Sequence, residues 1–195
     1  MDAFIASFAM VAVAEMGDKT QLLSFVLAAR FRGHAPAIIA GILVATLANH
    51  ALAAALGGLA ASFAHPDLLR WALGLAFLAF ALWALIPDKL DEDASRRTTH
   101  HGAFLTTLAL FFLAEMGDKT QLATVALGAK YASLTMVTLG TTLGMMAANV
   151  PAVLIGEKLG SRFPLAKMRF LAAALFALFG ALILFDVDIG LGLGG

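Results

Sequence analysis

The chain has 195 residues and carries thirteen lysines and arginines against thirteen aspartates and glutamates. Hydrophobic residues make up 61% and charged residues 13%, whereas a soluble domain has about 45–50% apolar residues, glycine included, and about 25% charged ones. So little polar surface excludes a water-soluble globule, and the balanced charge gives no basic footprint for nucleic acid. The absence of cysteine excludes disulfides and thiolate metal sites.

Six apolar segments are long enough to cross a bilayer, because a span needs about 20 mainly apolar residues. They are residues 3–29, 36–61, 68–87, 103–130, 133–156 and 166–185. Each segment is too long for a strand and lacks alternation of polar and apolar residues. The first segment follows no basic region and is interrupted by charges, so we expect it to be retained and not cleaved as a signal peptide. The predicted fold is an all-α integral membrane protein with six transmembrane helices.

The basic residues lie mainly on one side of this predicted membrane domain. With six spans, both termini share a side with the second-to-third and fourth-to-fifth connections, and that side carries only Arg70 and Lys130. The opposite side carries nine basic residues: Arg30, Arg32, Lys89, Arg96, Arg97, Lys158, Arg162, Lys167 and Arg169. Because cytoplasmic loops carry the excess of lysine and arginine, the long polar loop is predicted to be cytoplasmic and both termini outside.

One nine-residue stretch, Ala-Glu-Met-Gly-Asp-Lys-Thr-Gln-Leu, occurs identically at residues 14–22 and 114–122. Each copy opens a group of three predicted spans. The domain organisation is therefore a first three-helix repeat at 1–87, a polar loop at 88–102 and a second three-helix repeat at 103–195. Because three is odd, the second repeat is inverted relative to the first, as in many secondary transporters whose substrate lies near the midplane.

Small residues recur at every fourth position of the span that follows each motif. One stripe consists of Gly41, Ala45, Asn49, Ala53, Gly57 and Ala61, and the other of Gly140, Gly144, Ala148, Ala152, Gly156 and Gly160. Such stripes let helix backbones approach closely within a membrane. The stripes match at an offset of 99 residues and the motifs at 100, which leaves the register of the repeat open by one residue.

Each motif places acidic side chains near the middle of a span, where they share one helical face. The candidate ligands are Glu15, Asp18 and Gln21 in the first copy and Glu115, Asp118 and Gln121 in the second. One charge exposed to lipid at this depth costs about 2.5–3.5 kcal/mol, so the cluster predicts an ion pathway or mutual pairing. Gly17 weakens the helix and favours a local break, which would free backbone carbonyls as further oxygen ligands.

The chemistry of this cluster points to a hard divalent cation. Four carboxylates with Lys19 and Lys119 sum to −2 when all are ionised, which one divalent cation neutralises. Oxygen ligands favour Ca²⁺, Mg²⁺ or Mn²⁺, and the motif has no cysteine or histidine for zinc or copper. Further oxygen donors in or near the motifs are Thr20, Thr120, Asn49 and Asn149.

Several of these residues also allow a purely structural interpretation. Lys19 could pair with either acid of the second motif and Lys119 with either acid of the first, in a network that only joins the repeats. Asn49 and Asn149 either complete the coordination or hydrogen-bond between helices. His50 has no counterpart at the position 100 residues later, where Val150 stands, so we expect it to be peripheral.

The pattern Glu-x-Gly-Asp-Lys-Thr, once in each half, resembles the signature E-x-G-D-[KR]-[ST] of the GDT-type membrane cation transporters, which include MneA-type bacterial manganese exporters. The resemblance covers essentially the whole chain. It assigns to the signature Glu15, Gly17, Asp18, Lys19 and Thr20, and Glu115, Gly117, Asp118, Lys119 and Thr120. It implies transport of Mn²⁺ or Ca²⁺ in exchange for protons. The compact size and the lack of a transit peptide fit a member in the bacterial inner membrane.

These features predict a secondary antiporter, without a cofactor, that exports a divalent cation, Mn²⁺ before Ca²⁺, through the lipid bilayer. A buried carboxylate favours its neutral form, so protons can replace the metal when it leaves. The alternatives are a passive divalent-cation channel, an exporter of a cationic organic solute such as lysine, a membrane enzyme and a structural membrane subunit. The sequence has no nucleophile constellation and no predicted domain outside the membrane, which argues against the enzyme.

Overall fold

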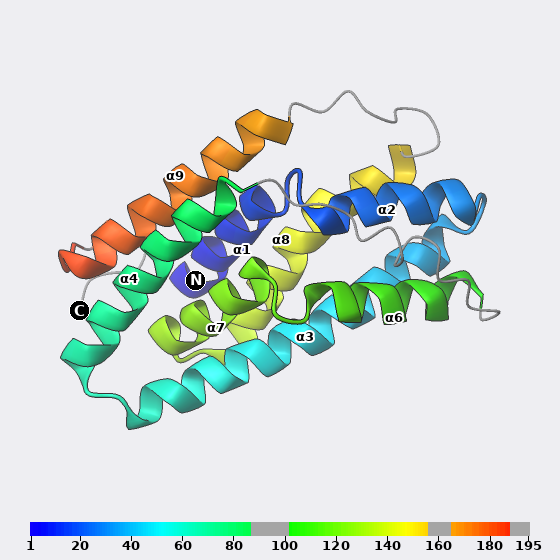
Figure 1. Cartoon of the computed structure of the whole chain (residues 1–195). Helices are drawn as coiled ribbons and strands as arrows, with labels where there is room; N and C mark the ends of the chain where they lie inside the picture. The colour runs from blue at the N-terminus through cyan, green and yellow to red at the C-terminus, as the bar shows by residue number, and fades with distance from the viewer. Residues whose placement is uncertain (87–101, 156–164, 188–195) are drawn as a thin grey trace.

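The computed structural model describes residues 1–86, 102–155 and 165–187, without the side chains of 165–168. All regular structure in these ranges is helical, which confirms the predicted all-α class for this part of the chain (Figure 1). The helices are α1 (Asp2–Ala14), α2 (Lys19–Arg30), α3 (Ala35–Phe63), α4 (Pro66–Ala84), α6 (Ala103–Glu115), α7 (Lys119–Tyr131), α8 (Leu134–Ile155) and α9 (Leu165–Leu184). The predicted loop at 88–102 lies outside the described residues apart from its last position.

Among the described residues, three helices, α3, α4 and α8, are long and apolar enough to cross a membrane. Helices α1 and α6 are apolar but shorter, as is the part of α9 from Arg169 to Leu184. The spans predicted at 3–29 and 103–130 are not continuous helices, because each is divided near its middle. The break that Gly17 favours is therefore present, and the second copy of the motif has one as well.

The two breaks have the same local geometry. Gly17 and Gly117 have φ angles of +87° and +74°, in the left-handed region that glycine enters without the steric penalty of a Cβ atom. The backbone N–H of Gly17 donates to Oε1 of Gln21 at 2.8 Å, and that of Gly117 donates to Oε1 of Gln121 at 2.7 Å. The Gly and Gln of each motif together turn the chain and satisfy a backbone donor that the interrupted helix leaves unpaired.

The helices pack in matching pairs across the two halves. Helix α1 packs on α8 and α6 packs on α3, while α2 packs on α8 and α7 packs on α3. The remaining pairs include α4 with α9 and α3 with α8. In Figure 1 the chain runs from left to right through α1 and α2 and from right to left through α6 and α7. Each divided helix thus lies against the long helix of the other half.

Glycine contacts define how α3 corresponds to α8. A Cβ atom on Gly41 would lie 2.8 Å from the backbone oxygen of Phe104, and one on Gly140 would lie 2.6 Å from that of Phe4. The two glycines are 99 positions apart and the two phenylalanines 100. The packing therefore supports an offset of 99 between α3 and α8, so that position 50 corresponds to position 149.

The side chains are distributed as lipid requires. Large apolar residues are exposed along the helices, among them Leu43, Leu47, Leu59, Leu75, Leu82, Leu113, Leu143 and Leu178. Charged and polar residues are buried instead, including four carboxylates and one lysine with at most 4% exposure. Aromatic rings fill the contact between α4 and α9, where the ring centres of Phe77 and Phe176 lie 6.3 Å apart. Apolar faces outside and polar groups inside are what a bilayer favours.

Candidate ion-binding site

Three of the four predicted carboxylates meet in the interior. Glu15, Asp18 and Asp118 each offer an oxygen atom, and these atoms all lie within 4.8 Å of one another. All three side chains are buried, with exposures of 0%, 1% and 4%. Glu15 follows the end of α1, Asp18 precedes α2 and Asp118 precedes α7. The two motifs, one hundred residues apart in sequence, therefore form one acidic cluster.

The two aspartates occupy the N-cap positions of α2 and α7. Neither side chain accepts a capping hydrogen bond from its own helix. The positive end of a helix dipole stabilises a nearby anion, so two helix N-termini offset part of the cost of burying these carboxylates. The break in each divided helix thus has an electrostatic role as well as a steric one.

Two ion pairs cross between the motifs. Nζ of Lys19 lies 3.0 Å from Oδ1 of Asp118, and Nζ of Lys119 lies 2.5 Å from Oδ1 of Asp18. The Lys19 side chain is 27% exposed, whereas that of Lys119 is buried. These contacts match the pairing expected of a joining network, and they balance two of the four negative charges. A net charge of −2 remains when all four carboxylates are ionised.

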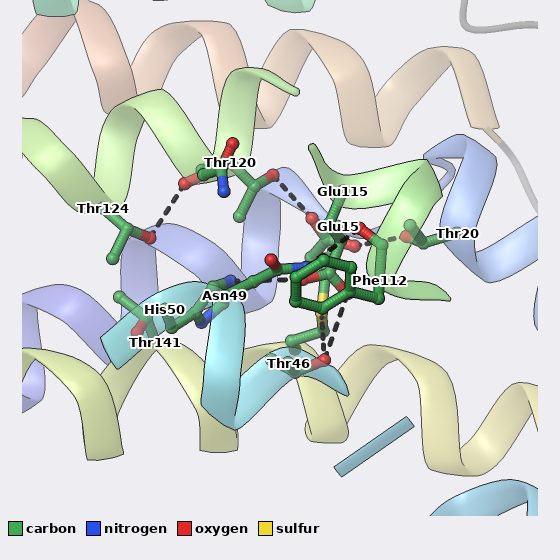
Figure 2. A network of polar contacts seen from close by, with 12 residues as sticks. Glu15, Thr20, Thr46, Asn49, His50, Phe112, Glu115, Thr120, Thr124 and Thr141 are labelled. Carbon is green, nitrogen blue, oxygen red and sulfur yellow. Dashed lines mark hydrogen bonds and ion pairs between the residues drawn. The ribbon is translucent and has the colours of Figure 1, made fainter. Parts of the chain in front are cut away.

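Glu15 is held by one threonine from each motif (Figure 2). Oγ1 of Thr20 donates to Oε2 at 2.5 Å, and Oγ1 of Thr120 donates to Oε1 at 2.5 Å. Each carboxylate oxygen of Glu15 therefore accepts one hydroxyl hydrogen bond, and bonds to an ionised acceptor are the stronger class of hydrogen bonds. The threonines that the motif predicts as additional oxygen donors are brought to the site by both copies.

Glu115, the fourth predicted ligand, has different partners. Its Oε1 lies 3.1 Å from Oγ1 of Thr46, and its Oε2 lies 3.8 Å from Nε2 of His50. The carboxylate is 1% exposed and is repelled electrostatically by Glu15 and Asp118. Glu115 therefore adjoins the three-carboxylate cluster but faces α3, and the two identical motifs are used asymmetrically.

The glutamines and asparagines form contacts between and within elements. Oε1 of each glutamine accepts the glycine N–H described above, and Nε2 of Gln21 donates to the backbone oxygen of Ala148 on α8 at 3.1 Å. Nδ2 of Asn49 donates to the backbone oxygen of Phe112 on α6 at 3.1 Å. Oδ1 of Asn149 accepts a hydrogen bond from Ser24 on α2 at 2.8 Å. Both asparagines therefore hydrogen-bond between helices, while Oδ1 of Asn49 has no hydrogen-bond partner among the described residues.

The expectation that His50 is peripheral is wrong. The side chain is fully buried, and Figure 2 shows it in the same polar network as Asn49, Thr46 and Glu115. An ionisable residue in the middle of a membrane helix is by itself a signal of function. At an offset of 100 residues the sequence relates His50 to the apolar Val150, which led to the wrong expectation. The packing relates α3 to α8 at an offset of 99, which relates His50 to Asn149. Thr46, which has no comparable sequence signal, was also missed.

Comparison with known proteins finds sequence relatives over most of the chain. The sequence profile of a family described as "Divalent cation/proton antiporter GDT1" matches residues 3–92 and 103–189. A protein named "Putative manganese exporter" from Vibrio cholerae is 52% identical over 91% of this chain and 88% of its own length. No solved structure matches the chain.

More distant relatives match part of the chain. A "GDT1-like protein" from Schizosaccharomyces pombe is 34% identical over 43% of this chain and 32% of its own length. The "Protein PAM71-homolog, chloroplastic" of Arabidopsis thaliana is 34% identical over 51% of this chain and 28% of its own length. The similarity therefore extends to eukaryotic proteins that are much longer than this one.

Proposed function

The chain belongs to the divalent cation/proton antiporter family, and from this premise we propose that it exports Mn²⁺, in preference to Ca²⁺, in exchange for protons. Membership makes it a membrane transporter of cations and not an enzyme, with divalent cations and protons as the transported species. The name of the Vibrio cholerae relative, which this chain matches over 88% of that protein's length, supports manganese as the substrate. We propose a bacterial inner membrane as the location.

The acidic cluster formed by Glu15, Asp18 and Asp118 carries this proposal. Three carboxylate oxygens within 4.8 Å of one another suit a hard divalent cation with oxygen ligands. Glu115 is proposed to complete the set from the side of α3. Gln21 and Gln121 are proposed as further oxygen ligands, and their Oε1 atoms also accept the glycine N–H of each break. Two lysines leave a net charge of −2, which one divalent cation neutralises.

Proton exchange follows from the cost of leaving this cluster empty. A buried charge without a partner is strongly unfavourable, so a departing divalent cation must be replaced by other positive charge. Two protons on the buried carboxylates supply it without any large movement of the lysines. The same neutralisation lets the metal-free protein change the side of the membrane from which the site is accessible. Export of the metal is thereby coupled to import of protons.

We propose that the site is opened to one side of the membrane and then the other by a movement between two inverted repeats. These repeats are residues 1–87 and 103–195, and a cytoplasmic loop at 88–102 connects them. The opposite directions of α1–α2 and α6–α7, and the matching contacts of each divided helix with the long helix of the other half, support this arrangement. Transporters built in this way bind substrate at the repeat interface near broken helices. The acidic cluster, which both motifs form beside the two helix breaks, is consistent with such a position.

The experiment is metal flux in proteoliposomes that contain a Mn²⁺-sensitive dye. We expect an imposed pH gradient to accelerate Mn²⁺ uptake by the wild type, and Asp18→Asn or Glu115→Gln to slow it about 10- to 100-fold, the usual cost of disturbing a metal site. Asp67→Asn serves as control, since its side chain is 84% exposed. Wild-type flux in both site variants would remove these carboxylates from the mechanism, and flux indifferent to the gradient would favour a passive channel.

A further inference from the structure

The contact between Glu115 and His50 is not explained by the hydrogen bonds of the fold. Oε2 of Glu115 and both ring nitrogens of His50 lack a hydrogen-bond partner among the described residues. Their closest approach, 3.8 Å between Oε2 and Nε2, is longer than a hydrogen bond. Both side chains are at least 99% buried. Since buried polar atoms are nearly always satisfied, such a set calls for a ligand or another specific partner.

The atoms around this pair offer a mixed set of ligands. Oδ1 of Asn49, the residue that directly precedes His50 on α3, also lacks a partner among the described residues. The sulfur of Met145 lies 3.0 Å from Oγ1 of Thr46, which in turn lies 3.1 Å from Oε1 of Glu115. The carboxylate oxygens of Glu115 and the amide oxygen of Asn49 are therefore grouped with the imidazole of His50, and the thioether of Met145 adjoins them through Thr46.

The other half of the chain offers no equivalent nitrogen. With the offset of 99 between α3 and α8, the residue that corresponds to His50 is Asn149, whose Oδ1 accepts a hydrogen bond from Ser24 and whose Nδ2 donates to the backbone oxygen of Met145. Asn149 is satisfied within the fold, while His50 is not. The asymmetry of the two motifs thus extends to the long helices that face them.

We propose that Glu115 and His50 form a second ion position, adjoining the acidic cluster, in which a nitrogen ligand selects first-row transition cations over Ca²⁺ and Mg²⁺. The proposal rests on the proposed function and refines its substrate class. Metal bonds to imidazole nitrogen and carboxylate oxygen are about 2 Å long, so two ligand atoms 3.8 Å apart can hold one ion between them. Imidazole nitrogen is a common ligand of first-row transition metals, of which Mn²⁺ binds most weakly, whereas Ca²⁺ and Mg²⁺ take oxygen ligands.

Pulsed electron paramagnetic resonance with Mn²⁺ alone tests this position directly, because a coordinated imidazole couples its nitrogen nucleus to the Mn²⁺ electron spin. We expect this nitrogen coupling in the purified full-length chain in lipid nanodiscs. It should be lost in His50→Asn, which installs the residue found at position 149, and kept in His65→Gln, whose exposed histidine lies outside the network. Absence of the coupling in the wild type, or its persistence in His50→Asn, would overturn the proposal.

Transport selectivity provides a second measurement. In proteoliposomes we expect His50→Asn to lower the ratio of Mn²⁺ flux to Ca²⁺ flux about 10-fold or more, the scale of losing a contact at a metal site, while His65→Gln leaves the ratio unchanged. An unchanged ratio in a folded His50→Asn protein would overturn the assigned selectivity. If the wild type transports Mn²⁺ but shows no nitrogen coupling, this inference fails and the proposed function stands. If the wild type moves no divalent cation, the proposed function itself fails.

His50→Gln guards against a variant that does not fold, because glutamine retains a polar group at this position. Circular dichroism and a monodisperse elution profile identify which variant is folded. A folded variant that keeps wild-type selectivity overturns the proposal, and one that loses it supports the proposal. The wild-type spectrum decides the presence of the nitrogen ligand without any variant.

Discussion

At the scale of single residues, Glu15 and Glu115 show how identical local sequences acquire different environments. Each glutamate stands at the second position of the same nine-residue motif. Glu15 accepts hydrogen bonds from Thr20 and Thr120, while Glu115 accepts one from Thr46 on the facing helix. The difference arises from tertiary contacts, because both threonines turn toward the same glutamate. A site with two acids in unlike environments can release metal and bind protons in separate steps.

The hydroxyl of Thr120 should stabilise the metal-free protein. We expect Thr120→Val to lower the free energy of unfolding by about 1–3 kcal/mol, the cost of leaving a buried acceptor unsatisfied. Thermal unfolding in detergent without metal measures this loss. Added Mn²⁺ should raise the melting temperature of the variant more than that of the wild type, because a bound cation satisfies Glu15 in place of the hydroxyl and stabilises the folded state by linkage.

Thr124→Val is the matched control, since the Thr124 hydroxyl donates to the backbone oxygen of Thr120 and not to the carboxylate. Its melting temperature should respond to Mn²⁺ as the wild type does. An equal metal response in Thr120→Val and Thr124→Val would contradict the assigned role of the Thr120 hydroxyl.

At the scale of elements, the divided helices bring the acidic groups together. A continuous helix would keep Glu15 and Asp18 on one helical face and would leave no helix N-terminus at the aspartate. The break instead places Asp18 at the start of α2 and Asp118 at the start of α7, while Glu15 and Glu115 remain near the ends of α1 and α6. Gly17 and Gly117, at positive φ, make this geometry possible.

Gly117→Ala tests whether the break itself is needed for transport. An L-residue in the left-handed region costs about 1–2 kcal/mol, and the alanine methyl group meets no atom within 4 Å at this position. The strain should therefore shift the backbone toward a continuous helix and move Asp118. We expect Mn²⁺ flux in proteoliposomes to fall about 10-fold or more, with a modest drop in melting temperature.

Gly33→Ala supplies the same strain at a distance from the site. Gly33 has a φ angle of +78°, and a Cβ atom there also meets nothing within 4 Å. Its variant should lose a similar amount of stability and retain flux. Equal flux in the two variants would show that the backbone conformation at Gly117 is not required by the transport cycle.

At the scale of the whole molecule, hydropathy and the duplicated motif predicted most of the helices and the three carboxylates that lie together, because both depend on local composition and spacing. They could not predict which helix of the other half faces each side chain. Thr46 meets Glu115 across 69 positions, and His50 reaches the same carboxylate only because α3 packs on α6. A one-residue uncertainty in register was enough to relate His50 to Val150 instead of Asn149.

The distribution of basic residues predicts the orientation of the whole chain in the membrane. Nine basic residues on one predicted side against two on the other predict a cytoplasmic loop and external termini. The chain contains no cysteine, so single cysteines can be introduced without background. We expect Asp2→Cys to react with a membrane-impermeant maleimide in intact bacterial cells, and Ser95→Cys to react only after permeabilisation, while the unmodified chain stays unlabelled. The reverse pattern would place the basic side outside and would contradict the predicted orientation.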